Sequence, residues 1–180
     1  MVSLNISQIL TGTPGISPIE GANLVENCIV ALHRNNHLNP VMLHLIDFEQ
    51  DAVPLYWEDR YDGQLERTYA DLQSVTERAA VCISILLALN LTEYTVIERS
   101  RKGTGFDYML GDKNDEFYQP TARLEISGIY QETEVNTVET RFSIKKRQTE
   151  RSDYTKLPAY ISVVEFGTPK AKFGRKEMEV

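Results

Sequence analysis

The chain has 180 residues, which is enough for one domain with its own hydrophobic core, or for one domain with an N-terminal extension. Its hydrophobic content of 42% and charged content of 25% are ordinary for a soluble globular protein. A formal net charge of −7 argues mildly against nucleic acid as a partner. The first residues lack a basic leader and no apolar run approaches about 18 residues, so we expect a cytoplasmic protein without a membrane segment.

The charge is unevenly distributed along the chain. Residues 141–180 contain ten Lys and Arg against five Asp and Glu, a balance of +5, whereas residues 1–140 have a balance of −12. A basic segment of this kind is either a docking face for an anion or an ordinary solvated surface. As an indicator of DNA binding it is weak.

The first third of the chain predicts a helix and a β-hairpin. The segment Ser17–Glu20 is a typical helix start, with a serine cap followed by a proline in the first turn. Two short β-prone runs follow, Val41–Phe48 and Val53–Trp57, with a polar turn between them. We therefore expect residues 1–63 to form an N-terminal extension, a helix plus a hairpin, packed on a core made by residues 64–180.

The rest of the chain alternates between helix and strand patterns. A long helix is expected over Gln64–Leu89, because its apolar residues recur at helical spacing and its last third is apolar nearly all round. A second helix is expected over Glu134–Arg151. Strand patterns lie between and after these helices, at Thr95–Arg99, Gly105–Leu110, Ala122–Ile129 and Leu157–Phe166. Residues 167–180 are Lys-rich with one proline and two glycines, and are expected to form an exposed basic tail.

Two carboxylates lie on the two central strands of this pattern. Alternation places Asp107 opposite the aromatic face of the first strand, and it places Glu125 on the polar face of the second, with Arg123 and Ser127. A hairpin joining the strands would bring the carboxylates together, and close carboxylates repel each other unless a cation or a proton lies between them. Magnesium prefers oxygen ligands of this kind. The alternative is two solvated side chains on the outer face of an antiparallel pair.

From Gln64 onward the predicted order is helix, strand, strand, strand, helix, strand. This order resembles the core of the PD-(D/E)XK nuclease superfamily, the restriction-endonuclease-like fold, over roughly residues 64–166. In that family the second strand carries an Asp and the third carries (Asp/Glu)-x-Lys. Here Asp107 ends Gly105-Phe106-Asp107, and Glu125 lies about eighteen residues later in Leu124–Ser127. The resemblance implies an α/β fold with a restriction-endonuclease-like αβββαβ core, in which helices flank a mixed central sheet.

One residue departs from the family motif. The motif lysine, which is thought to orient or activate the attacking water and to offset charge on the phosphate, is Ser127 here. Some members recruit this lysine from the following helix, and that predicted helix carries Arg141, Lys145 and Gln148 on one stripe. The resemblance then implies that Lys145 partners the scissile phosphate and that Gln148 bonds to the phosphate or the water. The catalytic residues implied are Asp107, Glu125, Lys145 and Gln148. A solvated basic face is the alternative.

The resemblance also implies a cofactor and a substrate. Mg²⁺ (or Mn²⁺) would be held by Asp107 and Glu125, with Glu98 as a third carboxylate and Glu77 as a weaker fourth. The implied activity is metal-dependent cleavage of DNA phosphodiesters, in restriction, repair or phage defence, with DNA, a protein partner or a second copy of the chain as partners.

Two other interpretations remain open. The second is a catalytically inactive nuclease-fold domain that serves as a binding or assembly subunit, which Ser127 and the negative net charge favour. The third is an unrelated α/β protein that binds a small ligand. The direction of Lys145 distinguishes the first two: an inward Lys145 near the carboxylates favours the enzyme, and an outward one favours the scaffold.

Overall fold

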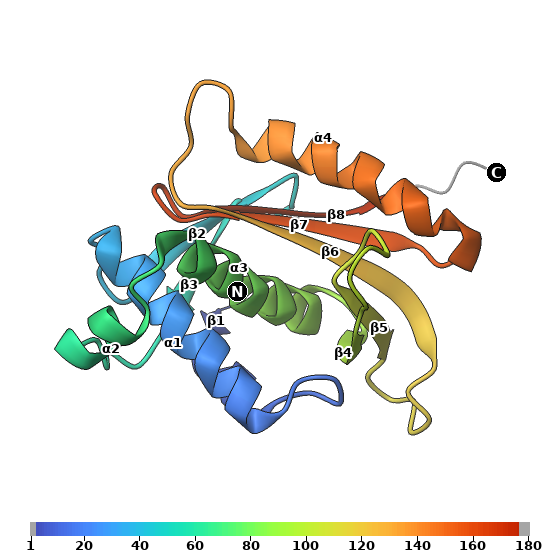
Figure 1. The fold of residues 1–180 in the computed structure, drawn as a ribbon, viewed down its shortest axis with the longest axis horizontal. Coiled ribbons are helices and arrows are strands. Elements are labelled where there is room, and N and C mark those ends of the chain that lie inside the picture. The colour runs from blue at the N-terminus through green and yellow to red at the C-terminus, as the bar shows by residue number, and fades with distance from the viewer. Residues whose placement is uncertain (1–2, 177–180) are drawn as a thin grey trace.

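The structure is a computed structural model that describes residues 3–176, and it confirms the expected mixed α/β class (Figure 1). One curled, mixed sheet of eight strands has helices on both faces. The strands are β1 Leu4–Asn5, β2 Val41–Ile46, β3 Ala52–Tyr56, β4 Tyr94–Arg99, β5 Tyr108–Asp112, β6 Pro120–Ile129, β7 Ala159–Glu165 and β8 Lys170–Lys176. The α-helices are α1 Pro18–Arg34, α2 Gly63–Thr68, α3 Leu72–Leu91 and α4 Val138–Gln148, and the 3₁₀ helices are η1 Ile6–Thr11 and η2 Thr149–Thr155.

The strands run across the sheet in the order β1-β3-β2-β8-β7-β6-β5-β4. Strands β4, β5 and β6 form an antiparallel meander, and β7 lies parallel to β6 after α4. At the other end, β2 and β3 form an antiparallel pair, and β2 lies parallel to β8. The N-terminal hairpin is therefore part of the same sheet as the later strands, joined to them by backbone hydrogen bonds.

Helices α1 and α3 pack on one face of the sheet, and α4 packs on the other (Figure 1). Helix α3 lies against α1, β6 and β7, and its side chains Ile83 and Leu86 are buried in the main core. By length and composition alone α3 could cross a membrane, but 61% of its most apolar stretch is buried inside the molecule. The apolar surface of α3 is thus covered by α1 and the sheet.

The helix expected over Gln64–Leu89 is two helices, α2 and α3. The side chain of Asp71 accepts a hydrogen bond from the Ser74 backbone N–H, and so caps a new helix where a continuous one was predicted. The helix expected over Glu134–Arg151 is also shorter, because the Thr137 side chain caps α4 and η2 begins at Thr149. The predicted start of the first helix is confirmed: Ser17 caps α1 and Pro18 is its first residue.

The expectation of an exposed basic tail is wrong for residues 170–176. These residues form β8, which lies between β2 and β7 and buries Ala171 and Phe173. Alternation puts lysines on the opposite face, where Lys170 and Lys172 pair with the carboxylates of neighbouring elements. The rest of the predicted tail, residues 177–180, lies outside the described residues.

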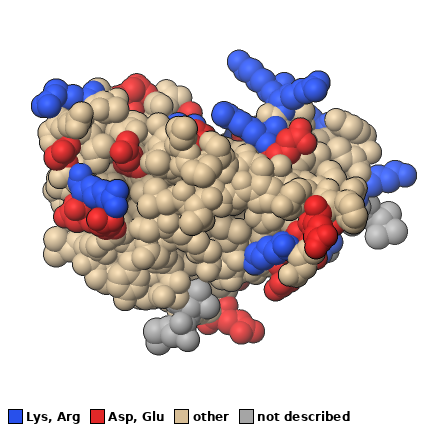
Figure 2. Space-filling view, turned by 90° about the horizontal axis from the view of Figure 1, so that it is seen from below, with Lys and Arg blue, Asp and Glu red and all other residues tan. Residues whose placement is uncertain are grey.

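Figure 2 shows the face of the molecule that lies at the bottom of Figure 1. Its charged side chains lie mostly around the outline of this view, and the described residues at its centre are uncharged. Within the described part of the chain, this face therefore offers no continuous basic strip for nucleic acid.

Candidate active site

Asp107 lies immediately before β5 and is fixed to β6 by two hydrogen bonds. Its backbone N–H donates to the carbonyl of Leu124 at 2.8 Å, and its carboxylate Oδ2 accepts from the Ile126 N–H at 2.7 Å. Two residues earlier, Gly105 has φ +85° and lies so close to the carbonyl of Gln148 that a Cβ would be 2.6 Å from that oxygen. Only glycine suits both requirements. The loop carrying Asp107 is therefore packed against the end of α4.

Glu125 lies on β6, faces α4 and is only 1% exposed. Its Oε1 accepts hydrogen bonds from Lys145 Nζ at 2.6 Å and from Gln148 Nε2 at 2.9 Å. Lys145 Nζ also donates to the side-chain oxygen of Gln148 at 3.2 Å. The structure thus brings together all four residues predicted for the catalytic group, because Asp107 and Glu125 lie within hydrogen-bonding reach of each other.

Burial shifts the titration of both carboxyl groups upward. It is the main cause of the raised pKa of Asp107, against which the Ile126 N–H and the Lys145 charge act. The pKa of Glu125 is raised to about 7, first by burial and then by the charge of Asp107, although the hydrogen bond and charge of Lys145 lower it. Near neutral pH, the pair has a strong tendency to hold either a proton or a cation.

A cleft of about 360 Å³ lies beside residues 126–128 of β6, between α3 and α4, and its lining includes Arg99, Asp107, Ser127, Arg141 and Lys145. Glu125 is buried and meets this cleft through Asp107 and Lys145, both of which lie next to it. Asp107 Oδ1 and Glu125 Oε2 accept no hydrogen bond from an N–H or O–H of the described residues. The two carboxyl groups lie within reach of each other, so a cation or a proton between them would relieve their repulsion, and on the Asp107 side the cleft has room for the waters that magnesium retains. These residues fit a magnesium ion.

The structure does not bring Glu98 into this group. Glu98 lies on β4 opposite Met109, is exposed, and does not line the cleft. Glu77 on α3 lines the cleft but is exposed and accepts a hydrogen bond from Gln73. Among residues 3–176, no three His, Cys, Asp or Glu side chains are grouped as metal ligands. The candidate metal site therefore has two protein carboxylates, and its other ligands would be water or substrate.

Ser127, at the position of the family's lysine, is paired with a cation from α4. Its hydroxyl accepts a hydrogen bond from Arg141 Nη1 at 3.2 Å, and the other nitrogens of Arg141 bond to the side-chain oxygen of Asn136. The sequence placed Arg141 on the same helical stripe as Lys145 but gave it no function. The contribution of Arg99 was missed entirely; it lies beside Asp107 because Arg99 pairs with Tyr108 across β4 and β5.

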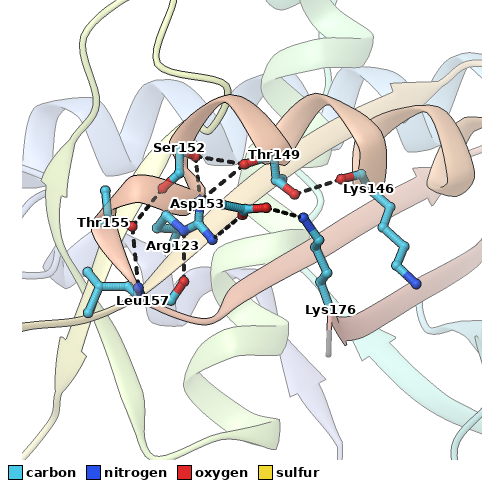
Figure 3. A network of polar contacts seen from close by, with 8 residues as sticks. All are labelled: Arg123, Lys146, Thr149, Ser152, Asp153, Thr155, Leu157 and Lys176. Carbon is cyan, nitrogen blue, oxygen red and sulfur yellow. Dashed lines mark hydrogen bonds and ion pairs between the residues drawn. The ribbon is translucent and has the colours of Figure 1, made fainter. Parts of the chain in front are cut away.

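Arg123 fixes the end of α4 to the strand that carries Glu125 (Figure 3). Its guanidinium is 1% exposed and donates to the backbone oxygens of Thr149 and Leu157, to Ser152 Oγ and to the Asp153 carboxylate. Thr149 directly follows Gln148, so these bonds hold the helix in register with β6. Arg123, Glu125 and Ser127 point to one face of β6, and each meets a successive part of the α4–η2 segment.

The chain matches no protein-family model, and comparison with curated proteins and with solved structures gave no significant match.

Proposed function

We propose that this protein is a metal-dependent nuclease of the PD-(D/E)XK type that cleaves DNA phosphodiesters. The observation that carries the proposal is the inward direction of Lys145, whose Nζ lies 2.6 Å from Glu125 in a cleft that Asp107 also lines. A lysine so placed supplies the positive charge that Ser127 does not. Gln148, bonded to the same carboxylate oxygen, completes the predicted set.

The order and direction of the elements support this proposal. A buried helix, α3, precedes the antiparallel meander β4-β5-β6, and α4 then leads to β7, which is parallel to β6. This order is consistent with the αβββαβ arrangement that the resemblance implies. Asp107 immediately precedes the second strand of the meander, β5, and Glu125 lies on the third, β6, which are the strands on which the family has its acidic residues.

The chemistry follows from the contacts. Magnesium held by Asp107 and Glu125 would lower the pKa of a bound water and offset charge on the phosphate. Lys145 would bind a non-bridging oxygen of the scissile phosphate and oppose the charge that develops there. Gln148 orients the Glu125 carboxylate and can donate to the phosphate or to the attacking water. The Ile126 N–H holds the Asp107 carboxylate in one orientation.

A second candidate function is a catalytically inactive nuclease fold that acts as a binding or assembly subunit. Two observations favour it: the described residues offer only two grouped carboxylates, and Lys145 already forms an ion pair with Glu125. In this case the ion pair would be structural. The cleft would bind a partner without cleaving it.

Calorimetric titration with Mg²⁺ and Mn²⁺ separates the two functions. We expect wild type to bind the metal and to cleave plasmid DNA, and we expect Asp107→Ala to lose both properties while remaining folded. The matched control is Glu116→Ala, which removes an exposed carboxylate from the β5–β6 loop and should behave as wild type. A wild-type protein that shows neither metal binding nor cleavage would overturn the nuclease and leave the inactive fold.

A further inference from the structure

Arg141 lines the cleft beside the carboxylate pair, and its charge has no acidic partner among residues 3–176. Its guanidinium bonds only to neutral oxygens, the Ser127 hydroxyl and the Asn136 side-chain carbonyl. Two other cations around the cleft are compensated: Lys145 pairs with Glu125, and Arg78 pairs with Glu20. A partly buried guanidinium held by neutral groups keeps its attraction for an anion, since no carboxylate of the described part of the chain pairs with it.

The position of Arg141 relative to Lys145 is set by the helix and the strand together. Arg141 lies one helical turn before Lys145 on α4, and its partner Ser127 lies two residues beyond Glu125 on β6. Two strand residues span about 6.6 Å. The spacing between Glu125, which bonds to Lys145, and Ser127, which bonds to Arg141, is therefore comparable with the separation of successive phosphates along a nucleic acid strand.

The cleft continues past Arg141 into a second hollow of about 430 Å³. The first turns of α3 and the segment after β6 line this hollow, and Arg141, Glu77 and Gly128 line both. On the other side of the carboxylates lies Arg99, whose side chain forms no hydrogen bond or ion pair with any residue of the described 3–176. Arg99 and Arg141, two cations without a partner among the described residues, thus line the same cleft as Asp107, and this cleft shares Arg141 with the second hollow.

We propose that Arg141, oriented by Ser127 and Asn136, binds the backbone phosphate adjacent to the scissile one. The inference rests on the proposed function, because it places a nucleic acid strand in the cleft. The strand runs from Arg99 past the Asp107–Glu125 pair to Arg141 and leaves through the second hollow. Ser127 therefore serves as the acceptor that positions the Arg141 guanidinium.

The test measures binding in the absence of any divalent metal, so that it does not depend on cleavage. Fluorescence anisotropy of labelled single-stranded and duplex oligonucleotides would be followed against salt concentration for wild type, Arg141→Gln and Arg141→Lys. Each phosphate contact contributes about 0.9 to the slope of log K against log salt for duplex DNA, and about 0.7 for single strands. We expect Arg141→Gln to lose one such increment and Arg141→Lys to retain it.

Arg147→Gln is the matched control. It removes the same charge from the same helix at an exposed position, where the Arg147 side chain forms no hydrogen bond or ion pair with the described residues. Its slope should equal that of wild type. A scan of oligonucleotides with single neutral methylphosphonate linkages should find one position that weakens wild type and does not affect Arg141→Gln.

The outcomes separate this inference from the nuclease proposal. Normal cleavage with equal slopes for Arg141→Gln and Arg147→Gln overturns the phosphate site and leaves the nuclease. If Arg141→Gln has a salt slope smaller by one phosphate contact and the wild-type protein does not cleave DNA, the phosphate site is supported and the nuclease proposal is overturned. A wild-type protein that binds neither oligonucleotide overturns the phosphate site. Circular dichroism of each variant confirms that a lost increment does not come from unfolding.

Discussion

Glu125 is the residue on which the candidate site depends, because it is buried, acidic and bonded to two side chains of α4. The sequence placed Lys145 and Gln148 on one stripe beside the buried Val138, and it left open whether they turn toward the sheet or form a solvated face. It could not predict that both would bond to the same carboxylate oxygen, because that depends on how far α4 stands from β6. The hydrogen bonds of Arg141 to Ser127 and Asn136 could not be predicted either, because they also depend on how α4 packs on β6.

The raised pKa of Glu125 predicts how stability varies with pH. Its folded pKa, about 7, exceeds the ordinary value of 4.5, so the folded state holds a proton that the unfolded state has lost. The associated stability is complete below about pH 4.5 and is lost as pH rises through 7; Asp107, also raised, acts in the same direction. The loss is on the order of a few kcal/mol.

Glu125→Gln isolates this effect, because glutamine stays neutral. We expect the variant to match wild type near pH 5 and to be more stable than wild type near pH 8, by denaturant unfolding at both pH values. Magnesium should raise the wild-type melting temperature at pH 8 and leave that of the variant unchanged. A variant that is less stable than wild type at pH 8 would show that Glu125 is a structural residue.

At the scale of the elements, Arg123 ties three of them together: β6, η2 and the approach to β7 (Figure 3). The sequence placed Arg123 on the face of β6 that carries Glu125. It could not predict that the Arg123 guanidinium would be buried. The polar segment after Gln148 reads as the end of a helix or as a loop, and only its folding into η2 over the strand encloses the guanidinium. The break between α2 and α3 was missed for a related reason, since apolar periodicity outweighed the capping signal of Asp71.

Arg123→Met should destabilise the protein by about 3 kcal/mol or more, because it leaves the buried carbonyls of Thr149 and Leu157 without their donor. Lys176→Met removes the other, more exposed partner of Asp153 and should cost less than about 1 kcal/mol. Denaturant unfolding of both variants tests the difference. Equal losses would mean that the network contributes only through the charge of Asp153.

At the scale of the whole molecule, β8 joins the two parts of the sheet, since β2 and β7 are its neighbours. The strands of the second half were predicted nearly in place from alternation and β-propensity. Strand β8 was missed because its lysines suggested a solvated tail, although alternate residues are apolar. Its parallel pairing with β2 could not be predicted, because no local pattern identifies a partner so distant in the sequence.

Ala171→Asp tests this junction. Ala171 is fully buried between the neighbouring strands, so an unpaired carboxylate there should cost more than about 3 kcal/mol and broaden or abolish the thermal transition. Arg175→Asp introduces the same residue at an exposed position of β8 and should change stability only slightly. If Ala171→Asp melts like Arg175→Asp, the sheet does not depend on β8.

The central place of a strand that comes so late in the sequence has a consequence during synthesis. Until residues 170–176 have left the ribosome, β2 and β7 both present an edge of unpaired backbone groups, and neither half of the sheet can be closed. Pairing β2 with β8 also requires closure of a loop that spans most of the chain, which slows folding. The nascent protein is therefore partly folded and prone to aggregation until β8 has been made. Chaperones that shield strand edges should increase the yield of folded protein.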